Sequence, residues 1–103
     1  EGTDEVGAIY LAGNNLTGTI PDEIGALRLQ HLFMPFNNIS GTLPDSVCNF
    51  GDSLHQLVLG FNKLTGTIID CFDKLQNLTH IELDVNQFTG GIPRTVNTLK
   101  RLK

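Results

Sequence analysis

Few side chains in this sequence of 103 residues could carry out chemistry; among them are three histidines and two cysteines. A serine nucleophile needs a histidine and an acid close to it. Ser40, Ser46 and Ser53 have no such partners at matching positions of the chain's repeated pattern. The glycines occur singly rather than in a phosphate-binding run. We therefore predict no catalytic residue and no cofactor.

Histidine and cysteine are common zinc ligands. His31 and His80 hold equivalent positions in the pattern but belong to units that are two apart. Stacked units lie about 4.8 Å from one another, so these two histidines would be too distant to share an ion. The cysteines have no histidine in phase with them. The sequence therefore predicts ordinary surface histidines and no metal site.

Cys48 and Cys71 are 23 residues apart and occupy similar places in consecutive units. If consecutive units stack, the two Cα atoms could lie within the roughly 4.4–6.8 Å that a disulfide requires. The alternative is a pair of buried free thiols, which pack like small apolar side chains. The spacing alone leaves both alternatives open.

A unit repeated four times positions all these residues. Asn14, Asn37, Asn62 and Asn86 lie 23, 25 and 24 residues apart, and each begins a similar segment. The segments read N-N-L-T-G-T-I-P, N-N-I-S-G-T-L-P, N-K-L-T-G-T-I-I and N-Q-F-T-G-G-I-P. A period of this length indicates stacked repeat units rather than a globular domain with a central pocket.

The spacing L-x-x-L-x-L-x-x-N-x-L upstream of these segments resembles that of leucine-rich repeats, and L-T-G-x-I-P resembles their plant-type subclass. The resemblance covers roughly residues 6–101. It implies an α/β solenoid, a right-handed superhelix with a parallel β-sheet on the concave side and short helical or 3-10 turns on the convex side. It also implies four units in residues 1–103, at approximately 6–28, 29–53, 54–77 and 78–101, as part of a longer array.

Two inward apolar residues separated by one outward residue predict a short strand in each unit. The strands are expected near 9–11, 32–34, 57–59 and 81–83. The resemblance implies that the four repeated asparagines form a buried ladder, because their amides can pair with backbone groups of the turn. Asp22 and Asp45, which follow prolines, are expected to cap the helical turns.

Outward residues of the strands should align in columns on the concave face. Six residues are candidates for partner binding: Tyr10, Phe33, Val58 and Glu82 in one column, with Phe36 and Phe61 beside it. An exposed apolar cluster commonly marks an interface, and aromatic side chains are frequent anchors there. We therefore expect a protein or peptide ligand on this face. For Phe36 and Phe61, packing against the strand-end turn is the alternative.

Three N-glycosylation sequons, at Asn15, Asn38 and Asn77, favour an extracellular or secretory location, with an organelle lumen as the alternative. No apolar run is long enough for a membrane span. The net charge of −4 argues against a nucleic-acid partner. The basic residues near the end of the chain are expected to be solvated, namely Arg94, Lys100, Arg101 and Lys103.

The resemblance implies a protein-binding scaffold, similar to receptor ectodomains or secreted enzyme inhibitors, and not an enzyme. One alternative is a structural accessory subunit of a larger complex. Another is an ice-binding protein, because hydroxyl side chains recur in ladders that resemble the flat faces of ice-binding solenoids. These ladders comprise residues 17–19, 40–42, 65–67 and Thr89.

Overall fold

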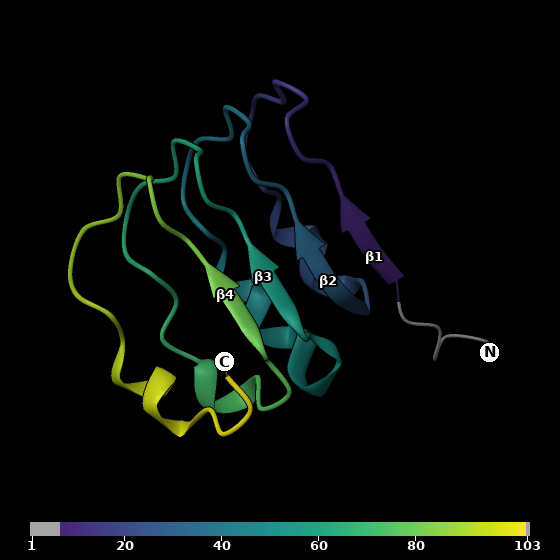
Figure 1. Cartoon of the computed structure of the whole chain (residues 1–103), viewed down its shortest axis with the longest axis vertical. Helices are drawn as coiled ribbons and strands as arrows, with labels where there is room; N and C mark the ends of the chain where they lie inside the picture. Colours follow the sequence, from purple (N-terminus) through teal and green to yellow (C-terminus); the bar gives the residue numbers. More distant parts are fainter. Residues whose placement is uncertain (1–6, 103) are drawn as a thin grey trace.

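Four parallel strands form one sheet in chain order (Figure 1). The structure is a computed structural model that describes residues 7–102, so Val6 and Lys103 lie outside the described residues. The strands are β1 (Gly7–Tyr10), β2 (Leu29–Phe33), β3 (Gln56–Val58) and β4 (His80–Glu82). Backbone pairing continues just past them, as in the 2.7 Å bond that the Leu59 N–H donates to the Glu82 carbonyl. The predicted α/β solenoid with a parallel sheet is confirmed.

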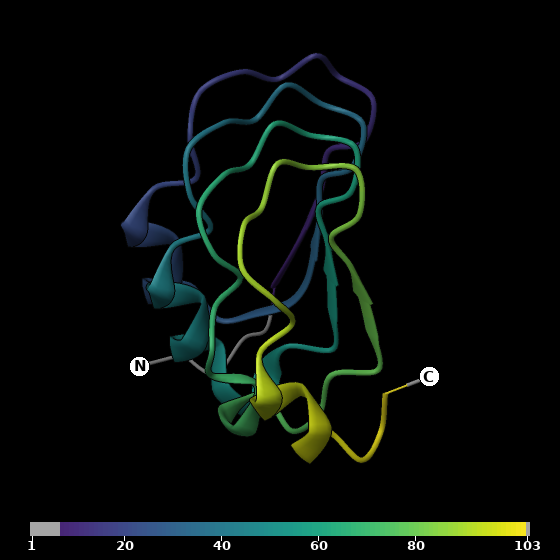
Figure 2. The same cartoon turned by 90° about the vertical axis from the view of Figure 1, so that its left-hand side faces the viewer.

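Short 3-10 helices lie across the coil from the sheet (Figure 2). They are η1 (Asp22–Ala26), η2 (Asp45–Ser53), η3 (Phe72–Lys74) and η4 (Arg94–Thr98). A proline precedes η1, η2 and η4, where its fixed φ suits the approach to a helix. Asp22 and Asp45 are the first helical residues and make no capping hydrogen bond, so the prediction that they cap was wrong.

The apolar core lies between the sheet and the helices, and its burial depends on neighbouring coils. Leu32 and Leu57, in the middle of the stack, are fully buried. Ile9 and Ile81, which align with them in the outer strands, are only half-buried. Leu11 is 40% exposed. No coil can cover its own apolar face, so the described end coils leave part of theirs open.

The repeated asparagines connect adjacent coils. Asn62 is 7% exposed; its Oδ1 accepts the Ile39 N–H at 3.1 Å, and its Nδ2 donates to the Met34 and Leu59 carbonyls at 3.0 Å each. Asn37 and Asn86 make equivalent bonds. Asn37 is buried and Asn86 is half-buried, whereas Asn14 is exposed. The ladder is confirmed at the other three positions, but the predicted burial of Asn14 was wrong because no coil precedes it within residues 7–102.

Candidate protein-binding face

The sheet register creates the outward column that the sequence predicts. Tyr10 pairs with Phe33, Phe33 with Val58, and Val58 with Glu82. Tyr10 is 56% exposed, Phe33 is half-buried and Glu82 is exposed. Tyr10 and Glu82 are therefore the most accessible residues of this column, and Phe33 is partly covered.

Val58 differs from this expectation. It is only 1% exposed, so its predicted place on the exposed face was wrong. The register puts it between Phe33 and Glu82, whose side chains are longer than its isopropyl group. A short side chain between two long ones is covered by them. We therefore define the aromatic face as Tyr10, Phe33, Phe36 and Phe61, and treat Val58 as a support beneath it.

Tyr10 is the centre of a ring cluster at one end of this face. Its ring centroid lies 5.6 Å from that of Phe33 and 5.7 Å from that of His31, and His31 lies 6.3 Å from His55. Tilted contacts at these distances are among the arrangements that aromatic rings favour. Sequence reasoning missed His55, which precedes β3 and reaches the cluster only because the coils stack. The buried Nδ1 of His31 has no hydrogen-bond partner.

Phe36 and Phe61 form a second aromatic group, just after the strands. Their rings are stacked, with centroids 4.4 Å apart and an angle of 13° between the planes. They nevertheless remain 57% and 42% exposed. Both have φ near +60°, an unusual conformation for a bulky residue. The two rings pack against each other and remain accessible.

The β4 end of the face is acidic. Glu82 Oε2 lies 3.1 Å from His80 Nε2, and both side chains are about half exposed. Asp84 follows β4 and is exposed. Its carboxylate lies over Gly60, where a Cβ would be only 2.9 Å from Oδ1. Among residues 7–102, no group of three acidic, histidine or cysteine residues is arranged to hold a metal ion.

Hydroxyl side chains line a different side of the solenoid. Isolated parallel bridges join Thr19 to Ser40, Thr42 to Thr65, and Thr67 to Thr89. The methyl groups of Thr19 and Thr42 lie against Gly41 and Gly66, where an added Cβ would approach them to 2.8 and 3.0 Å. The glycines therefore let successive hydroxyl pairs stack closely.

Two hollows also lie away from the aromatic face. One, of about 610 Å³, contains Asp22, Asp45 and Ser46 beside the hydroxyl ladder. The other, of about 470 Å³, is apolar and opens at the first coil among Leu11, Leu16 and neighbouring core residues. The second hollow is the uncovered end of the core described above.

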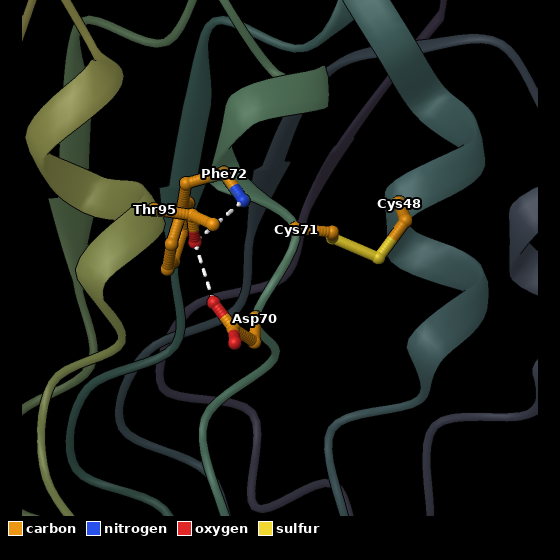
Figure 3. Close-up of a disulfide and its surroundings, with 5 residues drawn as sticks. All are labelled: Cys48, Asp70, Cys71, Phe72 and Thr95. Carbon is orange, nitrogen blue, oxygen red and sulfur yellow. Dashed lines mark hydrogen bonds between the residues drawn. A yellow bond between two sulfur atoms is a disulfide. The ribbon is translucent and has the colours of Figure 1, made fainter.

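A disulfide joins the third coil to the second (Figure 3). Cys48 lies in η2 and Cys71 immediately precedes η3, with their Cα atoms 5.9 Å apart. Beside this bond, Thr95 Oγ1 donates to Asp70 Oδ1 at 2.8 Å and accepts the Phe72 N–H at 3.1 Å. Of the two alternatives for the cysteines, the structure contains the bonded pair.

The three sequons differ in accessibility. Asn15 and Asn38 are exposed. Asn77 is half-buried, and its Nδ2 donates to the Asp52 carbonyl at 2.8 Å. Attachment of a glycan at Asn77 would have to break or replace that bond. Asn15 and Asn38 are therefore the more accessible acceptors.

Coils of 23 to 25 residues stacked on a parallel sheet define a solenoid repeat protein. The sequence model of the Leucine Rich Repeat family matches residues 8–27, 28–50 and 53–75, and this chain belongs to that family. Arabidopsis thaliana receptor-like kinase TMK4 is 34% identical over 89 residues, which are 86% of this chain and 10% of the kinase. The resemblance to plant-type repeats is confirmed.

Two solved structures illustrate the range of related solenoids. The leucine-rich repeat ectodomain of the Arabidopsis receptor kinase HAESA, in complex with an N-terminally extended IDA peptide hormone ligand, matches with a TM-score of 0.90 and 31% identity, over 94% of this chain and 16% of that one. A plant ice-binding protein matches with a TM-score of 0.79 and 36% identity, over 86% of this chain and 29% of that one. The chain thus spans less than a third of each relative.

Proposed function

We propose that this chain is a protein-binding segment of a plant-type leucine-rich repeat array, and that it binds a protein or peptide through the aromatic face. The main observation that supports this proposal is the group of aromatic side chains on and beside the sheet. Tyr10, Phe36 and Phe61 in this group are 42–57% exposed. Exposed aromatic clusters of this kind are typical anchors for a partner. The peptide-bound HAESA ectodomain, to which the chain is similar, supports a peptide as the partner.

The proposal includes an extracellular or secretory location and a binding rather than a catalytic role. A disulfide between Cys48 and Cys71 suits an oxidising compartment. The similarity to a receptor ectodomain supports the same location. Among residues 7–102, no helix has both the length and the apolar character that crossing a membrane requires.

The binding proposal is tested by selecting peptides from a random library on the immobilised chain and measuring their affinity for variants. Tyr10→Asp is expected to weaken the selected peptides at least about tenfold, or about 1.4 kcal/mol, because it places a charge in the aromatic face. Tyr10 is more than half exposed, so the variant should remain folded. Ile92→Asp is the matched control, because Ile92 is 76% exposed but lies outside the aromatic face.

Two results would contradict this proposal. If no peptide is enriched, the chain is not a peptide-binding segment. If the selected peptides bind the Tyr10 variant as well as the parent, the interface lies elsewhere on the solenoid. Circular dichroism of each variant separates loss of binding from loss of folding.

Glycosylation provides a separate prediction. When the protein is expressed through a plant secretory pathway, we expect glycans at Asn15 and Asn38, whose side chains are exposed. Glycosidase treatment should then lower the mass, and Asn15→Gln with Asn38→Gln should remove most of that decrease. We expect lower occupancy at Asn77 because its amide already donates to Asp52. An unchanged mass after treatment would count against the secretory location.

Ice binding is a second candidate function, favoured by one structural feature. The hydroxyl ladder places exposed Thr19, Thr42 and Thr67 at the same position of successive coils. Coils repeat at about 4.8 Å, which gives the ladder a regular spacing. The similarity to a plant ice-binding protein supports this candidate.

The two functions use different surfaces and can be separated. If the ladder binds ice, the chain should inhibit ice recrystallisation, and Thr42→Lys should abolish the inhibition while peptide binding is retained. Tyr10→Asp should weaken peptide binding and leave the inhibition of ice recrystallisation unchanged. A parent chain that does not alter recrystallisation would eliminate the second candidate.

A further inference from the structure

The residues just before the repeated asparagines form a column with one shared backbone conformation. They have φ values of +68°, +58°, +60° and +54° at Gly13, Phe36, Phe61 and Val85. The N–H groups of Gly13, Phe36 and Phe61 each donate to a carbonyl of the following coil, at 3.0–3.1 Å. The four positions are therefore equivalent, and side chains at them should extend in the same direction.

Side chains occupy three of the four positions. Phe36 and Phe61 are stacked, and Val85 continues the column on the far side of Phe61. Gly13 has no side chain, and a Cβ built there would meet nothing within 4 Å. One face of the Phe36 ring is therefore left uncovered on the side of the first coil. The greater exposure of Phe36, at 57% against 42% for Phe61, agrees with this arrangement.

We infer that the open position above Gly13 is a binding site for an aromatic side chain of a peptide partner, which would extend the Phe36–Phe61 stack by one ring. This inference rests on the proposed peptide-binding function. The stacked pair favours a planar apolar group, because aromatic rings gain most in offset-stacked or tilted contact with one another. The absence of a Cβ at Gly13 lets that group approach the first coil closely.

The acidic residues of the face indicate that the partner also carries a basic residue. Glu82 and Asp84 lie at the β4 end, and the outward positions of the four strands contain no lysine or arginine. The acidic end is three coils from Gly13, or about 14 Å, which is the length of about four residues of extended chain. The partner is therefore a peptide that lies across the strands, with an aromatic residue and a lysine or arginine about four positions apart.

The peptides from the library selection test this inference directly. We expect them to be enriched in an aromatic residue and a basic residue at that spacing. Gly13→Phe should weaken them at least about tenfold, because the chain's own ring would then occupy the site. Phenylalanine already adopts the required φ at Phe36 and Phe61, so the variant should fold. Ile92→Phe is the matched control, because it adds a ring at a 76% exposed position outside the aromatic face, and its affinity should stay within about twofold of the parent.

Two further variants keep the test decisive. Phe36→Asn removes the ring that the ligand would stack on, and asparagine tolerates the left-handed conformation better than phenylalanine. It should weaken the same peptides even if Gly13→Phe does not fold. Asp84→Asn should weaken peptides that carry the basic residue and leave analogues with norleucine at that position unchanged.

The outcomes separate this inference from the broader proposal. Peptides that lose affinity with Tyr10→Asp but bind Gly13→Phe and Phe36→Asn normally would overturn the stacking site and leave the proposed function standing. Enriched peptides that lack an aromatic and a basic residue at the expected spacing would also overturn the stacking site. A selection that yields no peptide would contradict the peptide-binding function on which this inference rests.

Discussion

Replacing both Cys48 and Cys71 by alanine should lower the free energy of unfolding by about 3 kcal/mol. The disulfide joins residues 23 apart, so its loss frees a long loop in the unfolded chain. It also fixes the least regular turn of the solenoid. The third unit has Ile69 where the others have proline, and η3 is only three residues long. Guanidinium unfolding followed by circular dichroism would measure the loss.

Reduction provides the control for this prediction. A reductant should lower the stability of the parent by a similar amount and leave the double alanine variant unchanged. If the parent is fully reduced, as shown by thiol counting, yet unfolds at the same guanidinium concentration, the disulfide contributes nothing to stability. The solenoid would then be held by its core and its hydrogen bonds alone.

Asn62→Ala should also destabilise the chain, by about 3 kcal/mol, because alanine cannot replace the hydrogen bonds of a buried amide. The Ile39 N–H accounts for most of this loss, since Asn62 Oδ1 is its acceptor. The Met34 and Leu59 carbonyls lose one bond each but keep those from Asn37 and Asn86. Urea unfolding of the parent and the variant would give the difference.

Asn14→Ala is a matched control because Asn14 has the same place in the repeat but is exposed. The substitution is expected to change the free energy of unfolding by less than about 0.5 kcal/mol. Equal losses at Asn14 and Asn62 would show that the repeat position matters for a reason other than bonding between coils. A loss at Asn62 below that of Asn14 would contradict the ladder as a source of stability.

Much of the fold could be predicted because each coil repeats the same local pattern. The phase of the strands follows from apolar residues at alternate positions, and Leu32 and Leu57 confirm it by their complete burial. The burial of Asn37 and Asn62 was predicted from the resemblance to leucine-rich repeats instead. Four copies of one pattern make the assignment of inward and outward positions consistent.

The candidate site was only partly predictable. The outward column of Tyr10, Phe33 and Glu82 follows from the strand phase, and the register agrees with it. The burial of Val58 does not follow, because it depends on the lengths of the side chains in the coils on either side. The contact of His55 with His31 likewise requires the stacked arrangement.

The sequence by itself determined which residues face inward and which face outward, because that depends on alternation within one strand. The tertiary structure decided how outward residues of different coils meet. It stacked Phe36 on Phe61, left Gly13 open beside them and brought the two cysteine sulfur atoms into a bond. These contacts depend on the separation and rotation between coils and on the rotamers of side chains about 24 residues apart, and the pattern within a single repeat contains none of that information.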